Sequence, residues 1–270
     1  MTNILQKIAT RTRESCALAR GLRVTTRTEE RARAMAAEEL AASGGTFAFP
    51  FERALRVPGM SFICECKKAS PSKGLIVEDF DPVAIARDYE EAGAVAVSVL
   101  TEPFFFEGDE RYLADVSAAV DIPTLRKDFV VDELMIYEAK ALGASAVLLI
   151  CAILSDEELA RFVALCHELG MSALVEAYEP EEVPRALAAG ARVVGVNNRD
   201  LRTFDVDFGR SIDLRPLVGP DRIFVSESGV ETAEDVARLA EAGVDAVLIG
   251  ETLMRAENKH AMLDELRSLL

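Results

Sequence analysis

Hydrophobic and polar positions alternate along the chain in a regular order. From about residue 60, short apolar runs rich in Val, Ile and Leu are separated by longer stretches in which apolar residues recur every three or four positions. Continuous apolar runs predict strands buried on both faces, and the longer stretches predict amphipathic helices. The predicted strands are residues 61–66, 95–100, 122–126, 145–150, 171–176, 192–197, 222–227 and 245–250.

An internal repeat supports this alternation. The segments EAGAVAVSV, ALGASAVLL, AAGARVVGV and EAGVDAVLI each join a glycine to a strand, about 50 residues apart. Helix starts are marked by Asp81-Pro82, an N-cap followed by proline, and by Ser155 with Glu158, a capping box. The helices before the strands are expected to end on left-handed glycines, namely Gly93, Gly143, Gly190 and Gly243.

A repeat of two strand–helix units in four copies predicts eight units. We therefore expect the α/β class and a (β/α)8 TIM barrel with an N-terminal helical extension. The alternative, a doubly wound sheet, would carry a Gly-x-Gly-x-x-Gly turn after its first strand, and the sequence has none there.

The first residues differ in charge from the rest of the chain. Residues 1–37 carry eight basic and three acidic residues. A mitochondrial transit peptide is one interpretation, but its acidic residues favour a helix that packs on the rest of the protein. Breakers in SGGTFAFP (43–50) predict a linker there. The expected division is a helical extension that caps the barrel (1–48) and a catalytic barrel (49–270).

Composition narrows the possible partners and the compartment. The net charge of −16 argues against binding to nucleic acid or to an anionic membrane, and no apolar run is long enough for a spanning helix. The five cysteines form no CxxC pair, so a disulfide framework or a zinc site is not expected. A reducing compartment fits this usage, which predicts a cytoplasmic protein.

Acid–base chemistry must come from residues other than histidine. The chain has two histidines, His167 and His260, and both are expected as solvated residues of amphipathic helices. In a TIM barrel the function lies at the carboxyl ends of the strands. The charged and amide residues found at those ends are Glu65, Lys67, Lys127, Glu176, Asn197, Arg199 and Glu227.

Several of these residues are expected to converge. Side chains alternate faces along a strand, and alternate strands of a barrel contribute to one interior layer. Glu65, Lys67, Lys127, Glu176 and Glu227 all come from odd-numbered strands. At the open end of the barrel, where the dielectric constant is low, lysines and carboxylates shift each other's pKa values. Such shifts favour general acid–base catalysis. A salt-bridge plug that only fills the barrel is the alternative, although buried ion pairs are weak stabilisers.

Loops at the carboxyl ends of the strands indicate which kind of ligand the barrel binds. Lysines cluster in the first loop (Lys67, Lys68 and Lys73), which indicates an anionic substrate. Ser228-Gly229 and Gly250-Glu251 each open a helix after the last two strands, where this fold binds phosphate. The Glu251 carboxylate must then point away from the phosphate. The adjacent phenylalanines 104–106 either pack under the N-terminal segment or line an aromatic pocket.

The sequence resembles the indole-3-glycerol phosphate synthase family. The resemblance covers nearly the whole chain, from NILQKIA at the start, and its segments follow in the family's order: ECKKASPSKG, LTEPFFFEGD, TLRKDFVVDE, LVEAYEPEE, VGVNNRDL, VSESGV and LIGETLMR. It implies a carboxy-lyase of tryptophan biosynthesis. Its substrate is 1-(o-carboxyphenylamino)-1-deoxyribulose 5-phosphate, and its products are indole-3-glycerol phosphate, carbon dioxide and water. It implies no metal and no organic cofactor.

The resemblance also implies residue roles. Lys127 is expected to protonate the ketose carbonyl oxygen as the ring carbon attacks. Lys67, held by Glu65, is expected to bind the substrate carboxylate, and Glu65, Lys67 or Glu176 assists the loss of water. Substrate-orienting positions are Asn197, Arg199, Glu227 and Ser228. The apolar wall is Phe106, Phe129, Leu148 and Leu248, and the phosphate site is Ser70, Gly229, Gly250 and Glu251.

Two other functions stay open from the residues alone. One is a Schiff-base lyase or aldolase that uses Lys127 as a nucleophile. The other is a phosphate-ligand sensor without catalysis. The expected partner is a small sugar-phosphate substrate carrying an anthranilate group. We predict a monomer, with a dimer as the alternative.

Overall fold

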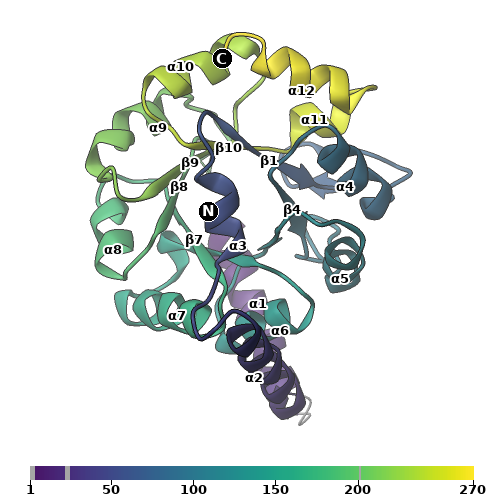
Figure 1. Ribbon diagram of the computed structural model, residues 1–270, viewed down its shortest axis with the longest axis vertical. Helices are drawn as coiled ribbons and strands as arrows, with labels where there is room; N and C mark the ends of the chain where they lie inside the picture. Colours follow the sequence, from purple (N-terminus) through teal and green to yellow (C-terminus); the bar gives the residue numbers. More distant parts are fainter. Residues whose placement is uncertain (1–3, 22–24, 201) are drawn as a thin grey trace.

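The core of the molecule is a closed barrel of eight parallel strands in the order β1-β10-β9-β8-β7-β6-β5-β4 (Figure 1). The computed structural model describes residues 4–21, 25–200 and 202–270. Almost every strand residue is buried, which confirms the prediction from the apolar runs. The strands are β1 (Ser61–Cys66), β4 (Ala96–Leu100), β5 (Thr124–Lys127), β6 (Ala146–Ile150), β7 (Ser172–Ala177), β8 (Val193–Asn197), β9 (Ile223–Glu227) and β10 (Ala246–Ile249).

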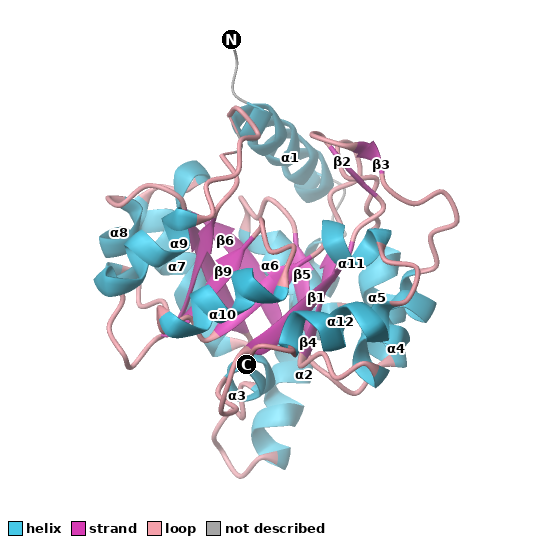
Figure 2. Cartoon of the chain, turned by 90° about the horizontal axis from the view of Figure 1, so that it is seen from above, coloured by secondary structure: helices cyan, strands magenta, loops and turns pink. Residues whose placement is uncertain are grey.

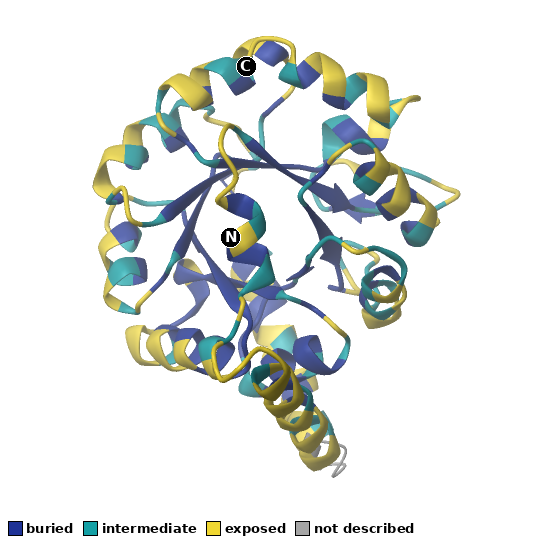
Figure 3. Cartoon of the chain, in the orientation of Figure 1, coloured by how far each residue is buried: buried dark blue, intermediate teal, exposed yellow. Residues whose placement is uncertain are grey.

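Helices cover the outside of the barrel, buried toward the strands and exposed outward (Figure 3). The predicted TIM barrel is therefore confirmed. Its helices are α4 (Pro82–Glu91), α5 (Glu110–Ala119), α6 (Glu133–Ala141), α7 (Asp156–Glu168), α8 (Glu182–Ala188), α9 (Gly209–Leu214), α10 (Ala233–Glu241), α11 (Glu251–Arg255) and α12 (Lys259–Arg267). The connections between these elements contain two short 3-10 turns, η1 (Cys151–Ile153) and η2 (Arg215–Leu217). They also contain a separate small hairpin, formed by β2 (Ala69–Ser70) and β3 (Gly74–Leu75).

The predicted helix ends are present. Gly93, Gly143, Gly190 and Gly243 all have positive φ, between 79° and 92°, where a side chain would be strained. Asp81 caps α4 ahead of proline, and Ser155 with Glu158 forms the capping box of α7.

The N-terminal extension consists of two helices that lie at opposite ends of the barrel (Figure 2). Helix α1 (Ile4–Gly21) crosses the carboxyl ends of the strands, beside the β2–β3 hairpin. Helix α2 (Thr25–Ala42) packs along α6 and buries Ala32 and Ala36. Only α1 therefore lies over the mouth of the barrel.

The amino-terminal end of the barrel is closed by helix α3 (Pro50–Leu55), which the sequence pattern did not predict. Pro50, expected as a linker breaker, is instead the first residue of this helix. Phe51 is fully buried, and Glu52 accepts a hydrogen bond from Ser172 at the start of β7 (3.0 Å). The segment after the extension is thus part of the barrel's packing.

The expectation of a solvated His167 is wrong. Its ring packs edge-on against Phe49, with the ring centroids 5.9 Å apart. Burial, with a contribution from Arg192, lowers its pKa to about 4, so it is neutral at pH 7. His260 is exposed, as predicted. In the ranges that the structure describes, no helix is long and apolar enough to cross a membrane.

Candidate active site

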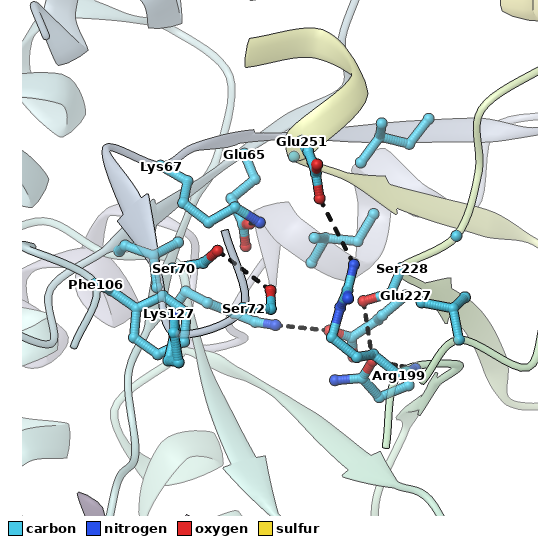
Figure 4. Close-up of a pocket in the computed structure, with 18 of the residues that line it drawn as sticks. Glu65, Lys67, Ser70, Ser72, Phe106, Lys127, Arg199, Glu227, Ser228 and Glu251 are labelled. Carbon is cyan, nitrogen blue, oxygen red and sulfur yellow. Dashed lines mark hydrogen bonds and ion pairs between the residues drawn. The ribbon is translucent and has the colours of Figure 1, made fainter. Parts of the chain in front are cut away.

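A cavity of about 480 Å³ opens at the carboxyl ends of the strands. All of the predicted site residues line it, whether they come from strand ends, from loops or from the start of α11. They are Glu65, Lys67, Ser70, Phe106, Lys127, Phe129, Leu148, Glu176, Asn197, Arg199, Glu227, Ser228, Gly229, Leu248, Gly250 and Glu251. Figure 4 shows that they reach the cavity from several sides.

Lys127, the last residue of β5, lies among carboxylates from two other strands. Its Nζ is 2.8 Å from Glu227 Oε2 and 3.8 Å from Glu176 Oε2. Asn197 donates a hydrogen bond to Glu176 (3.1 Å) and accepts one from Ser228 Oγ (3.0 Å). Strands β5, β7, β8 and β9 thus each place one polar side chain in a single connected group.

A second ion pair lies at the end of β1. Lys67 Nζ is 2.8 Å from Glu65 Oε1, and Ser98 Oγ donates a hydrogen bond to Glu65 Oε2 (3.3 Å). Gly250 makes room for this pair, because a Cβ there would come within 2.5 Å of Glu65 Oε1 and 2.8 Å of Lys67 Nζ. A side chain at Gly250 would therefore displace the charged pair.

Burial and charge change the pKa values in this group. Burial alone would lower the pKa of Lys127, but the carboxylates of Glu227, Glu176 and Glu65 outweigh it and raise that pKa. Burial, reinforced by the Glu227 charge, raises the pKa of Glu176 to about 8. Burial opposes ionisation of Glu65, but Lys67 and Lys127 overcome it and lower its pKa. At pH 7 the site therefore holds the Lys127 ammonium, an ionised Glu65 and a largely protonated Glu176.

The residues expected to bind phosphate also line this cavity, and Gly250 lies against the Glu65–Lys67 pair. Ser70 belongs to the β2–β3 hairpin, Gly229 follows β9, and Gly250 and Glu251 begin α11. The Glu251 carboxylate pairs with Lys73 (3.3 Å), Arg199 (3.7 Å) and Arg255 (3.2 Å). The side chain is thus neutralised by cations.

The apolar wall includes a pair of aromatic rings. Phe106 and Phe129 have ring centroids 6.0 Å apart, and Leu148 and Leu248 line the same cavity. The adjacent phenylalanines 104–106 were expected either to pack under the N-terminal segment or to line a pocket, and different members of the group do each. Arg11 of α1 lies over the ring of Phe104 at 3.4 Å, while Phe106 lines the cavity.

Some residues of the site were missed by sequence reasoning. Ile4, Leu5 and Ile8 of α1 contribute apolar lining from above. Gly195 in β8 leaves space that Glu227 Oε1 fills, and that oxygen is buried without a hydrogen-bond partner in the part of the chain that is described. Ser98 and Gly195 could have been found from the sequence, because each is a lone polar or glycine position inside an apolar strand. The described residues contain no group of three or more His, Cys, Asp or Glu side chains that could hold a metal ion.

Relatives share this sequence across most of its length. A protein from Lachnoclostridium phytofermentans named indole-3-glycerol phosphate synthase is 56% identical over 222 residues, covering 82% of each chain. One of the same name from Ruminiclostridium cellulolyticum is 55% identical over 219 residues, covering 81% of this chain and 84% of the relative.

Solved structures share the fold at low identity. 3-Hexulose-6-phosphate synthase gives a TM-score of 0.60 at 16% identity, covering 78% of this chain and all of its own. Thiamine phosphate pyrophosphorylase from Pyrococcus furiosus gives 0.58 at 16% identity, covering 78% of this chain and 94% of its own. The family model described as indole-3-glycerol phosphate synthase matches residues 19–266. With relatives more than 50% identical over four fifths of its length, the chain belongs to the indole-3-glycerol phosphate synthase family.

Proposed function

We propose that Lys127 is the general acid of the ring-closing step. The chain, as a carboxy-lyase of this family, converts 1-(o-carboxyphenylamino)-1-deoxyribulose 5-phosphate to indole-3-glycerol phosphate, carbon dioxide and water. When the ring carbon attacks the ketose carbonyl, the carbonyl oxygen gains negative charge and needs a proton. The observation that supports Lys127 most is its buried ammonium, held between Glu227 and Glu176 at the centre of the cavity.

Lys67, held by Glu65, binds the substrate carboxylate in this proposal. Lys67 keeps one carboxylate partner at 2.8 Å and lines the cavity, so its ammonium is directed into the site. The rings of Phe106 and Phe129 form an apolar wall for the anthranilate ring. Loss of carbon dioxide returns an electron pair to that ring, and apolar surroundings favour it because they desolvate the carboxylate.

Glu176 is proposed as the acid for the last step. Loss of water requires a proton on the departing hydroxyl group, and it also removes one proton from the newly closed ring, which Lys127, left neutral by the ring-closing step, takes up. Because its pKa is about 8, the Glu176 carboxyl carries a proton at pH 7, unlike Glu65, whose pKa is lowered. Glu227, whose other carboxylate oxygen holds Lys127, lines the cavity with Asn197 and Ser228, and in this proposal these three residues orient the hydroxyl groups of the substrate.

The phosphate group is assigned to the cluster of Ser70, Gly229, Gly250 and the backbone of Glu251. Ser70 offers a hydroxyl and the glycines allow close approach to the backbone. The nearby cations Lys73 and Arg199 favour an anion at this end of the cavity.

The remaining features of the proposal concern the whole chain. Residues 1–48 form the extension and 49–270 the catalytic barrel, which acts as a monomer in the cytoplasm. Five free, buried cysteines support a reducing compartment. A net charge of −16 supports a small-molecule partner rather than nucleic acid or a membrane.

A Schiff-base mechanism at Lys127 is less well supported. An amine must be neutral to attack a carbonyl, and the raised pKa keeps Lys127 charged. The test follows indole formation by absorbance and fluorescence, with EDTA present, and treats a parallel mixture of enzyme and substrate with cyanoborohydride, which reduces an imine and spares the ketone of the substrate. We expect indole formation and no trapped adduct. A reduced, covalent adduct on Lys127 would replace the general-acid role with a covalent one.

A further inference from the structure

A buried polar cluster lies behind Lys127, on the outer face of β5. Arg126 and Asp128 flank the lysine in sequence; Arg126 points to the opposite side of the strand, and Asp128 follows the last strand residue. Arg126 is only 2% exposed and Asp128 only 5%. Asp128 lines the cavity together with Lys127, whereas Arg126 does not.

Thr101, which follows β4, contacts all three residues of this stretch. Its backbone N–H donates to the Lys127 carbonyl (3.1 Å). Its hydroxyl donates to Asp128 Oδ2 and accepts from Arg126 Nε (3.2 Å). Thr101 therefore holds the backbone of Lys127 through its own backbone N–H, and the side chains on either side of the lysine through its hydroxyl.

Arg126 extends this cluster to the outer helices. Its guanidinium donates to the Met135 carbonyl (2.9 Å) and to Glu138 (3.2 Å) in α6, and to Glu110 (2.7 Å) in α5. The end of β5 is thus tied to β4, α5 and α6 at once. Asp128 also accepts from the N–H of Phe129 (2.8 Å), the next residue and a part of the aromatic wall.

Stability alone is a poor explanation for this arrangement. Buried charged groups contribute little net stability compared with apolar residues of the same size, but they fix geometry when every partner is satisfied. A proton donor needs such fixing, because small displacements of a reacting group cost large factors in rate. We propose that Thr101, Arg126 and Asp128 form a positioning cluster that sets the direction of the Lys127 ammonium. This inference rests on the proposed role of Lys127 as the general acid.

The test uses paired substitutions of Thr101 in the full-length enzyme. Thr101→Val keeps the shape and removes the hydroxyl, whereas Thr101→Ser keeps the hydroxyl. We expect Thr101→Val to lower kcat by about tenfold or more, with KM changed by less than about twofold, and Thr101→Ser to restore most of kcat. A kcat near wild type for Thr101→Val would overturn the proposal.

Ser172→Ala is the matched control. Ser172 is a buried hydroxyl bonded to the buried carboxylate of Glu52, at the opposite end of the barrel. Its loss should lower the melting temperature and leave kcat unchanged. An equal fall in kcat for Ser172→Ala and Thr101→Val would show a general effect of destabilisation and would contradict the positioning role.

A double substitution separates this inference from the role of Lys127. If Thr101 acts through Lys127, Thr101→Val should cost no further kcat in a Lys127→Ala background. A further tenfold loss there would contradict the proposal. If Lys127→Ala alone keeps its kcat, the general-acid assignment itself is wrong. Arg126→Met, provided that it folds, should reproduce the Thr101→Val result.

Discussion

At the scale of single residues, the site separates groups of similar chemistry by their surroundings. Glu65 and Glu176 are both buried carboxyl groups at strand ends, yet the pKa of one is lowered and that of the other is raised to about 8. The difference follows from their neighbours, because Glu65 has an ammonium partner at 2.8 Å and Glu176 lies near the charge of Glu227. One carboxyl therefore holds a cation while the other holds a proton.

A prediction for the pH profile follows from Glu176. If its protonated form is the active one, kcat/KM, which reports groups of the free enzyme, is high below the pKa and falls as pH rises through about 8. Glu176→Gln should remove that descending limb along with most of the activity. Glu179→Gln changes a half-buried carboxylate in the following loop, which pairs with Arg202 (3.0 Å) and does not line the cavity, and should keep the wild-type profile. If Glu176→Gln keeps the descending limb of the pH profile, that limb belongs to another titrating group.

At the scale of elements, helix α1 links the extension to the substrate cavity. Ile4, Leu5 and Ile8 line the cavity from above, and Arg13 donates to the Ile153 carbonyl (2.8 Å) in η1. The other helix of the extension packs on α6, away from the mouth. We therefore expect α1, and not α2, to contribute to substrate binding.

Substitutions on α1 test this division. Ile8→Ala removes apolar surface from the roof of the cavity and should raise KM by about fivefold or more, with kcat within about twofold of wild type. Leu18→Ala is the matched change on the same helix, at a position that is 74% exposed, and should alter neither constant. Steady-state kinetics of both variants provides the comparison. An unchanged KM for Ile8→Ala would reject α1 as part of the substrate site.

At the scale of the whole molecule, the sequence predicted the barrel and missed contacts that join distant segments. The strands were predictable because each is a local apolar run. The helix ends were predictable because they depend on single residues, such as Gly93, which adopts a positive φ, and Ser155, which caps α7. Helix α3 has only six residues, too few for a period to be read. His167 was misjudged because its partner, Phe49, comes from a segment about 120 residues earlier. Thr101 and Arg126 looked like ordinary strand-end residues because their meeting depends on the pairing of β4 with β5.

The two ends of the barrel are expected to carry different properties. The proposed catalytic residues lie at the carboxyl ends of the strands, whereas α3 closes the other end with a fully buried Phe51. Phe51→Ala should cost about 3–5 kcal/mol of unfolding free energy through the cavity it leaves. Its kcat, measured well below the melting temperature, should equal that of wild type. A large loss of kcat with little loss of stability would contradict this separation.

The central claim is that the buried ammonium of Lys127 supplies the proton for ring closure. Turnover of the carboxyphenylamino-deoxyribulose phosphate by wild type and Lys127→Ala, followed by indole fluorescence and paired with substrate binding by both proteins, tests it most directly. The absence of tryptophan keeps the protein's own fluorescence low. We predict a fall in kcat of at least about 100-fold with binding retained and the fold intact. A kcat near wild type for Lys127→Ala would contradict the account.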